Sequence, residues 1–520
     1  MELQSIRSLE RATRIARPEL FRLGTALIFI VGIMLFIIAR IEPGPNGVLL
    51  VAAAMIGGYM AMNIGANDVA NNVGPAVGSQ AITLTGAIII AVIFEAAGAI
   101  VAGGDVVSTI KKGIIDPSMI PDPDTFIWLM TAALLSAALW LNVATAMGAP
   151  VSTTHSIVGG VLGAGIAAAG WSIVNWNTVT AIAASWVISP LMGGIIAAAF
   201  LYVIKRTIVY QSDKIGAAKR FVPLLVAIMA WAFSTYLVLK GLKKLWKFDF
   251  LSATLIGFAV AVAVFFIVRP LVRRAAEYMD NDRDSVNRLF TLPLIGAAAM
   301  LSFAHGANDV ANAVGPLAAI NDAVLSGGIV ATASIPLWVM MVGAVGIALG
   351  LALYGPKLIR TVGSEITELD KTRAFCIALA AAITVIVASQ LGLPVSSTHI
   401  AVGGVFGVGF LREYLEANNA RMIDEIKLHH EGSPENVDEF LDKFDDAGLV
   451  DKGLMLQELK KQSTLELDKS ERKALKKVYR QELVKRSILL KIAAAWLITV
   501  PLAAILGAVL YFTIRGMMLP

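Results

Sequence analysis

The sequence predicts an all-α polytopic membrane protein with two repeats of inverted topology, broken or re-entrant helices and about 12–13 membrane segments. Three observations predict this class. Of the 520 residues, 57% are hydrophobic and only 16% are charged. Apolar runs of about 20 residues, the length that crosses a bilayer, recur along the whole chain. Three sequence motifs also occur twice in the same order, which indicates an internal duplication.

The composition excludes several classes of protein. A chain this apolar is not a soluble enzyme, and its net charge of +5 mainly reports which loops are cytoplasmic. No basic patch is interleaved with aromatic residues, so no nucleic-acid partner is expected. Cys376 is the only cysteine, which excludes an intrachain disulfide and a metal site built from cysteines.

Residues 1–47 are expected to form a basic cytoplasmic N-terminus and a first membrane helix. Five arginines precede an apolar run near residues 24–40. No small-residue cleavage site follows this run, which favours a membrane helix over a signal peptide. The arginines are Arg7, Arg11, Arg14, Arg17 and Arg22.

Three pairs of motifs define the duplication. They are GANDVANNVGP from Gly65 and GANDVANAVGP from Gly306, PVSTTHSIVGGVLGAG from Pro150 and PVSSTHIAVGGVFGVG from Pro394, and SWVISP from Ser185 and AWLITVP from Ala495. The first two pairs are 241 and 244 residues apart, whereas the tryptophans of the third pair are 310 residues apart. The second repeat therefore holds an insertion of about 66 residues.

Basic loops orient the two repeats. Two apolar runs, near 221–239 and 251–268, link the repeats, and a cluster of basic residues lies on each side of this pair. Both clusters are cytoplasmic by the positive-inside rule, so the first repeat begins outside, the second begins inside, and the repeats are inverted. The basic loop KGLKKLWKFDF from Lys240 disagrees, because it is predicted to be external. The clusters are Lys205, Arg206, Lys214, Lys219 and Arg220, then Arg269, Arg273, Arg274, Arg283 and Arg288.

Beyond residue 47 the chain is expected to divide into five parts. They are a first transport repeat at 48–204, two linking membrane helices with basic loops at 205–287, the first part of the second repeat at 288–411, a charged cytoplasmic helical insertion at 412–486 and the last helix of the second repeat at 487–520. The insertion is interpreted as a solvated cytoplasmic excursion, with regulation or partner docking as the alternative. The protein is expected in the cell inner (plasma) membrane, with a cytoplasmic N-terminus and an external C-terminus.

The PVSTTH and PVSSTH motifs indicate an anion site. Proline disfavours helix at the residue before it, and an apolar helix resumes after each motif, so the hydroxyl residues are expected at a helix N-terminus inside the membrane. Backbone N–H groups and neutral hydroxyl donors can hold an oxyanion there without the cost of a buried Arg or Lys. The alternative is that the hydroxyls only cap a broken helix. The residues are Ser152, Thr153 and Thr154 in the first repeat and Ser396, Ser397 and Thr398 in the second.

The GANDVAN motifs indicate a cation site. A carboxylate in the bilayer core costs at least about 2.5–3.5 kcal/mol, so Asp68 and Asp309 need a cation, a proton or a hydrogen-bonded partner. The flanking glycines and prolines are expected to let the helix unwind and expose carbonyl oxygens, which suit Na⁺ together with the carboxylates, while a carboxylate also suits H⁺. The alternative is polar contact between helices. Asn71 and Asn312 are assigned with the aspartates to the cation, and Asn67 and Asn308 to the anion.

Four further polar residues interrupt apolar runs. Glu95 is assigned to cation coupling, because intramembrane acids are functional candidates, although the second repeat has no matching carboxylate. His155 and His399 end the hydroxyl motifs and suit proton coupling, and a buried histidine bonded to a backbone carbonyl is the alternative. His305 aligns with Ile64 and is interpreted as having a local role.

These motifs resemble the duplicated signature of the PiT family of inorganic phosphate transporters, over roughly 48–204, 288–411 and 487–512. The resemblance implies an inverted-repeat helical fold of about a dozen crossings, with phosphate held by the two hydroxyl motifs and cations bound near the Asn-Asp pairs. The family includes Na⁺-coupled, H⁺-coupled and metal-phosphate importers, and some relatives carry sulfate. The complete GANDVAN in both halves favours Na⁺. Family members often carry a large hydrophilic loop between the halves, whereas here it lies within the second half.

The sequence therefore predicts a secondary active transporter that imports inorganic phosphate by cation symport, with Na⁺ favoured over H⁺ and alternating access around a midplane site. No enzymatic activity and no cofactor beyond the coupling ion are expected. The alternatives are a sulfate or metal-phosphate permease of the same family, an anion channel, and an intramembrane enzyme that uses Asp68 and Asp309 for acid–base chemistry. The oligomeric state is left open, a homo-oligomer included.

Overall fold

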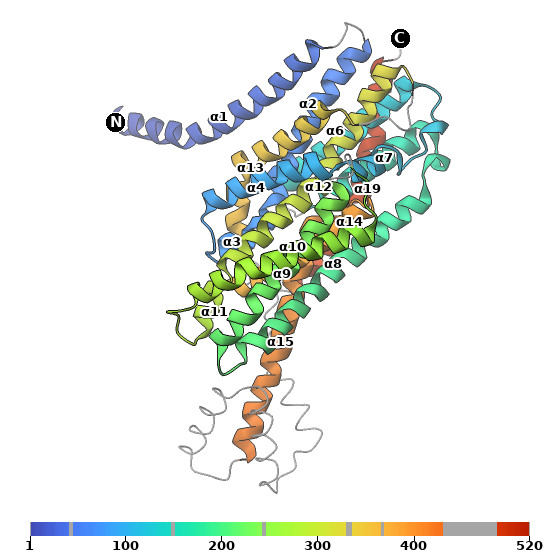
Figure 1. Cartoon of the computed structure of the whole chain (residues 1–520). Helices are drawn as coiled ribbons and strands as arrows, with labels where there is room; N and C mark the ends of the chain where they lie inside the picture. The colour runs from blue at the N-terminus through green and yellow to red at the C-terminus, as the bar shows by residue number, and fades with distance from the viewer. Residues whose placement is uncertain are drawn as a thin grey trace.

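In the computed structural model, most of the described residues are helical (Figure 1). These are residues 2–40, 45–146, 151–241, 246–328, 335–365, 369–429 and 486–518. Within these ranges the only β-type pairing is a single bridge between Ile115 and Val174. The prediction of an all-α membrane protein is confirmed.

The helices form two halves joined by a helical hairpin. The first half contains α1 (Glu2–Ile38), α2 (Pro45–Asn67), α3 (Val69–Gly78), α4 (Leu84–Ala102), α5 (Gly104–Lys112), α6 (Pro123–Ala146), α7 (Thr153–Ala169) and α8 (Trp176–Ile204). The hairpin is α9 (Lys214–Lys240) and α10 (Phe250–Ala275). The second half contains α11 (Arg283–Leu289), α12 (Thr291–Ser326), α13 (Leu337–Glu365), α14 (Lys371–Gln390), α15 (Ser397–His429) and α19 (Arg486–Met518).

Ten helical segments among the described residues are long and apolar enough to cross a bilayer, with α2 and α3 taken as one span. An eleventh is obtained if α11 and α12, which meet at a bend of 43°, are one span. The sequence predicted about 12–13 membrane segments, and the two segments that begin at the hydroxyl motifs are not among these spans. Those segments are α7, which is apolar but has only 17 residues, and the start of α15, which is followed by charged residues.

Helices of one half pack against helices of the other half in the core. α2 packs against α13 and α12 packs against α4. In the same way α7 packs against α19, and α15 packs against α8. Each of these contacts joins one helix of the first half to one helix of the second, so neither half has a separate core. The polar motifs of both halves are thereby brought into one interior.

Glycines of the GANDVAN motifs allow the closest of these contacts. A Cβ atom at Gly65 would lie 1.9 Å from the carbonyl oxygen of Ile347, and one at Gly306 would lie 2.1 Å from that of Glu95. Helix backbones approach this closely only where no side chain intervenes. Gly65 and Gly306 are the first residues of the two GANDVAN motifs, and each faces one carbonyl oxygen of a helix in the other half. Ile347, which faces Gly65, is therefore the structural counterpart of Glu95, which faces Gly306.

The expected unwinding at the GANDVAN motifs is wrong for the second half. α12 runs without interruption through Gly306 and Pro316. In the first half the interruption is the single residue Asp68, which keeps right-handed helical backbone angles. The glycines serve close packing between helices, and α12 continues through them as a helix.

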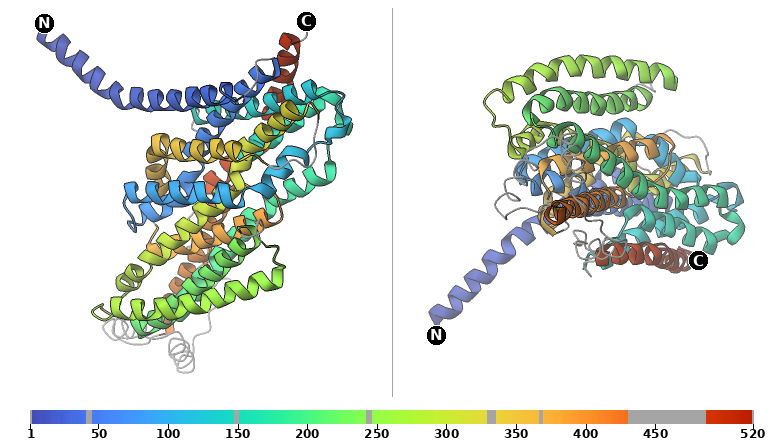
Figure 2. Two further views of the ribbon diagram at one scale, coloured as in Figure 1. Left: turned by 45° about the horizontal axis from the view of Figure 1, so that its top comes forward. Right: turned by 90° about the horizontal axis from the view of Figure 1, so that it is seen from below.

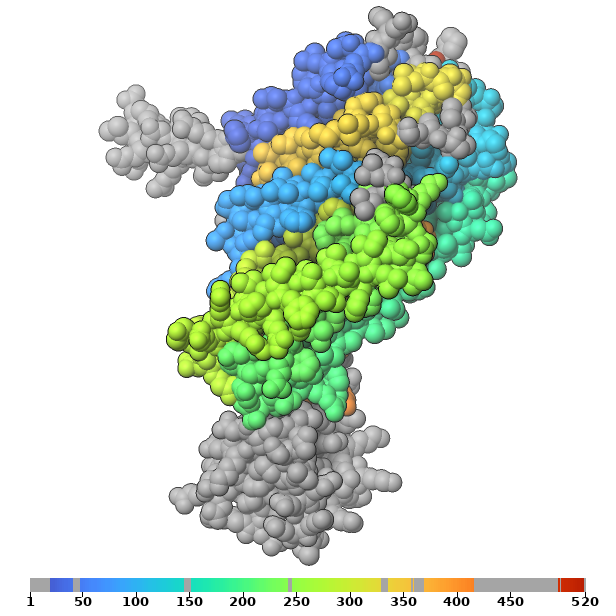
Figure 3. Space-filling view, viewed as in Figure 1, coloured from blue at the N-terminus to red at the C-terminus, as the bar shows by residue number. Residues whose placement is uncertain are grey.

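The hairpin of α9 and α10 lies outside the shared core (Figure 2) and forms one outer face in the space-filling view (Figure 3). α10 exposes large apolar side chains, among them Phe258, Phe266 and Ile267. Apolar patches of this kind suit contact with lipid. The turn between α8 and α9 and the far end of α15 project at the same end of the molecule (Figures 1 and 2).

Candidate ion and anion site

The two hydroxyl motifs begin helices, as the sequence predicted. α7 starts at Thr153, and the hydroxyl of Ser152 accepts a hydrogen bond of 3.3 Å from the backbone N–H of His155. α15 starts at the second motif, where Ser396 accepts the equivalent bond of 3.3 Å from the N–H of His399. The hydroxyl residues of both motifs are buried except Thr398, which is half-buried. Their serines are therefore helix caps, and the hydroxyls of the following threonines remain for other contacts.

The two motifs meet in the interior. Thr154 Oγ1 donates a 3.0 Å hydrogen bond to the backbone oxygen of Val395, which directly precedes the second hydroxyl cluster. This contact joins residues 241 positions apart in the chain. Two helix N-termini from different halves are thus held side by side.

Asp68 is the acceptor that both hydroxyl motifs share. Thr153 Oγ1 donates to its Oδ2 at 2.6 Å, and Thr398 Oγ1 donates to its Oδ1 at 3.2 Å. Asp68 is only 4% exposed, so a carboxylate without these donors would lack solvation. The sequence assigned hydroxyls to an anion and aspartates to a cation, and the structure places the two groups in direct contact.

The asparagines cross from one half to the other. Asn71 donates a 2.9 Å hydrogen bond to Thr398 Oγ1 of the second half. Asn312 in turn donates to Thr154 Oγ1 of the first half, at 3.1 Å. In each case the second asparagine of one GANDVAN motif donates to the threonine that ends the hydroxyl cluster of the other half. These bonds unite the GANDVAN and hydroxyl motifs of both halves in a single polar centre.

Asn308 has a different environment. Its Nδ2 donates to Ser389 Oγ at 2.9 Å and to the backbone oxygen of Leu393 at 3.1 Å. Its Oδ1 accepts from the backbone N–H of Val395 at 3.2 Å. These bonds hold the segment that leads into the second hydroxyl motif, so Asn308 positions that motif. Asn67, its counterpart, ends α2 and is half-buried.

His305 belongs to the centre, and its interpretation as a local residue is wrong. Its Nε2 lies 3.0 Å from Asp309 Oδ2, and its Nδ1 lies 2.7 Å from Glu95 Oε2. Asn72 Nδ2 donates to Glu95 Oε1 at 2.8 Å. Glu95 therefore reaches the centre through His305. The available signal was the four-residue spacing of His305 and Asp309, which places both on one face of a helix.

Asp309 is held less firmly by the hydroxyl motif than Asp68. Ser397 Oγ lies 3.4 Å from Asp309 Oδ2, at the limit of a hydrogen bond. Oδ1 of Asp309 is buried and has no hydrogen-bond partner among the described residues. Single donor atoms of Asp68, His305 and Asp309 all lie within 4.8 Å of one another. Two buried carboxylates this close together favour a cation between them.

The two motif histidines pack at the junction of the halves. The ring centroids of His155 and His399 are 5.0 Å apart, and the ring of His155 lies 3.8 Å from that of Trp186. Trp186 Nε1 donates a 3.1 Å hydrogen bond to the backbone oxygen of Pro394. These contacts give His155 and His399 a part in holding the two hydroxyl motifs together.

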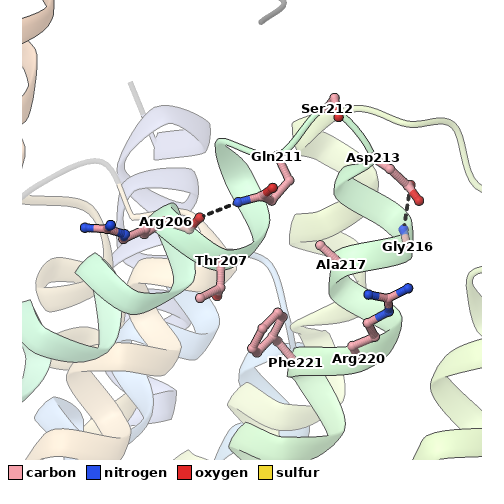
Figure 4. Close-up of a pocket in the computed structure, with 9 residues that line it drawn as sticks. All are labelled: Arg206, Thr207, Gln211, Ser212, Asp213, Gly216, Ala217, Arg220 and Phe221. Atoms are coloured by element: carbon pink, nitrogen blue, oxygen red, sulfur yellow. Dashed lines mark hydrogen bonds between the residues drawn. The ribbon is translucent and has the colours of Figure 1, made fainter. Parts of the chain in front are cut away.

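A separate surface pocket of about 450 Å³ lies between the end of α8 and the start of α9 (Figure 4). Arg206 and Arg220 are among its lining residues, and the side chain of Arg206 points away from α9 in this view. Gln211 Nε2 donates to the backbone oxygen of Arg206 at 2.8 Å. None of the candidate site residues lines this pocket, so it is distinct from the buried centre.

A doubled polar centre enclosed by membrane helices defines a membrane transport protein. The model of the phosphate transporter family matches residues 64–507, and the chain belongs to that family. A relative from Helicobacter pylori strain J99, named "Putative phosphate permease", is 56% identical over 98% of both chains. A similarly named relative from Pyrococcus abyssi is 40% identical over 72% of this chain and 92% of its own.

A solved structure has the same fold. It is titled "The sodium-dependent phosphate transporter" and is 32% identical in sequence, with a TM-score of 0.73. The match covers 91% of this chain and all of the solved chain. These relatives are permeases and transporters, which confirms both the family resemblance and the prediction that the protein is not an enzyme.

Proposed function

We propose that the protein imports inorganic phosphate across the cell membrane by symport with Na⁺. The observation that carries this proposal is the sharing of Asp68 between the two hydroxyl motifs. A hydroxyl has one hydrogen to donate, so Thr153 or Thr398 can serve Asp68 or a bound phosphate, but not both at once. Phosphate binding therefore requires something else to satisfy the carboxylate.

A cation meets that requirement. When the hydroxyls turn to phosphate, Asp68 loses its donors and faces a second anion in a buried site. Na⁺ bound to the carboxylate replaces the lost hydrogen bonds and removes the repulsion. Phosphate and Na⁺ then stabilise each other's binding, which is the reciprocal coupling that symport requires.

The residues of the proposed site fall into two groups. The anion is held by the hydroxyl motifs, with Asn67 and Asn308 in supporting positions. The cation is held by Asp68 and Asp309, assisted by Asn71, Asn312 and Glu95. Na⁺ is favoured over H⁺ because these ligands are hard oxygen atoms and because the solved relative is titled as sodium-dependent.

The exchange of partners between the halves supports an inverted repeat. Equivalent contacts run from Asn71 to Thr398 and from Asn312 to Thr154, the pattern expected of two halves related by a two-fold axis. Transporters built this way expose a midplane site to each side in turn, by movement of one half against the other. A cytoplasmic N-terminus and an external C-terminus remain the orientation that basic loops favour.

Uptake of labelled phosphate by proteoliposomes tests the proposal, with Na⁺ and pH gradients imposed separately. We expect saturable uptake that an inward Na⁺ gradient accelerates. Uptake driven by pH alone would assign the coupling to H⁺, and labelled sulfate in place of phosphate would reveal a sulfate permease. Phosphate flux that follows its own gradient without any cation dependence would contradict symport and indicate a channel.

A further inference from the structure

One nitrogen atom faces the oxygen atoms of the proposed cation site. His305 Nε2 lies 3.0 Å from Asp309 Oδ2 without the alignment of a hydrogen bond, and it has no hydrogen-bond partner among the described residues. His305 is completely buried, and Asp68 and Asp309 are each less than 5% exposed. The three donor atoms lie within 4.8 Å of one another. A buried imidazole nitrogen in this position has the geometry of a metal ligand.

The far side of the His305 ring is prepared for that role. Its Nδ1 lies 2.7 Å from Glu95 Oε2, and Asn72 holds the other oxygen of Glu95 at 2.8 Å. When Nδ1–H donates to Glu95, the lone pair of Nε2 points at Asp309. Histidines that bind metals almost always donate their second ring nitrogen to a carboxylate or carbonyl in this way, which fixes the tautomer and raises ligand basicity.

This arrangement occurs in only one half of the protein. The counterpart of His305 in the first motif is Ile64, and the counterpart of Glu95 by glycine contact is Ile347. Asn72 corresponds to Ala313 in the second motif. All three polar groups are therefore replaced by apolar side chains at the equivalent positions. The symmetric Asp and Asn pairs suffice for an oxygen site in either half, so the imidazole adds a property that only one half has.

We propose that Asp68, His305 and Asp309 form a site for a divalent first-row transition ion, of the class of Zn²⁺, Co²⁺ and Mn²⁺. Imidazole with carboxylates suits these ions, whereas alkali and alkaline-earth ions prefer oxygen alone. Donors around one such ion at about 2.1 Å are about 3.4 Å apart in a tetrahedral shell, so the three side chains, now within 4.8 Å of one another, need to close by about 1.4 Å at most. The inference rests on the proposed cation centre, and the metal competes there with Na⁺ and inhibits phosphate uptake.

Co²⁺ binding to the purified full-length chain in detergent tests the site directly. Titration calorimetry and visible absorption are followed in K⁺ buffer without Na⁺ or phosphate. The background carries His429→Ala and His430→Ala, which remove the two histidines that are adjacent in the sequence. We expect one Co²⁺ per chain. Glu95→Gln should weaken Co²⁺ binding about 10–100-fold, and His305→Gln should weaken it further. Unchanged Co²⁺ affinity in a monodisperse His305→Gln protein would overturn the proposal.

A spectroscopic arm needs no site variant. X-ray absorption of the Co²⁺-loaded protein should show imidazole coordination, and an all-oxygen shell would refute the site even if His305→Gln failed to fold. Added Na⁺ should raise the apparent Co²⁺ Kd. If Co²⁺ binds through His305 while Na⁺ has no effect, the metal site stands and the assignment of this centre to Na⁺ fails. The two proposals are therefore tested separately.

Discussion

Replacing Asp68 with Asn should make phosphate binding largely independent of Na⁺. The magnitude follows from the hydrogen bond to Thr153, whose Oγ1 lies 2.6 Å from Asp68 Oδ2. A hydrogen bond from the same hydroxyl to a phosphate oxygen adds about 2.7 Å, so the two negative charges would be about 5 Å apart. At an effective dielectric constant of about 20 their repulsion is about 3 kcal/mol, which is roughly 200-fold in Kd.

Titration calorimetry of phosphate in Na⁺ and in K⁺ buffer measures this quantity. For the unmodified protein, exchanging Na⁺ for K⁺ should raise the phosphate Kd by about 200-fold. In Asp68→Asn the repulsion is absent, so the same exchange should change the Kd by about tenfold or less, the remainder being due to Asp309. Uptake coupled to Na⁺ should be lost in this variant, because the cation has lost its ligand.

A matched control distinguishes the loss of a charge at the site from the loss of a charge elsewhere in the protein. Asp124 lies exposed in the first turn of α6, and Asp124→Asn removes the same charge without touching the centre. It should keep the full Na⁺ dependence. The reasoning is refuted if Asp68→Asn retains that dependence, or if the unmodified protein binds phosphate equally well in K⁺.

Three further predictions concern the shared anion site, the helix contact and the insertion. Thr154→Ala and Thr398→Ala should each weaken phosphate binding roughly ten- to a hundredfold and combine non-additively, whereas an effect of only one of them on Kd would contradict a shared site. Gly306→Ala should lower stability by about 1–3 kcal/mol in detergent unfolding, because its Cβ would lie 2.1 Å from a backbone oxygen of α4, and Gly104→Ala, with open space around it, should not. Deleting residues 433–465 should leave uptake measurable, since this block interrupts a repeat whose other copy lacks it, and complete loss in a correctly inserted protein would place the insertion in the mechanism.

The features that the sequence could predict are those that depend on neighbours along the chain. Apolar runs revealed the membrane spans, and proline before a hydroxyl cluster located the starts of α7 and α15. Duplicated motifs indicated a doubled site. Each of these signals is local, because a membrane helix satisfies its own backbone hydrogen bonds within one segment.

The features that sequence reasoning missed depend on contacts between distant segments. The bond between Asp68 and Thr398 joins residues 330 positions apart, so no local pattern could show that hydroxyls and carboxylates share a site. Glycine is also ambiguous in a sequence, since it permits either a break in a helix or a close approach of two helices. At Gly306 the second use holds, and the predicted unwinding was therefore wrong.

Asp68 and Asp309 occupy equivalent positions of the two GANDVAN motifs but have different neighbours. This difference gives them different roles in the proposed symport. Asp68 is bound by a hydroxyl from each half, and those hydroxyls must leave it when phosphate binds. Asp309 instead faces His305 at 3.0 Å and has only a 3.4 Å contact with Ser397. A cation at Asp309 can therefore bind without displacing a strong hydroxyl bond, whereas a cation at Asp68 replaces donors that phosphate takes away. The cation at Asp68 is the one whose affinity must depend on phosphate, because only there do the bound anion and the carboxylate compete for the same hydroxyl donors.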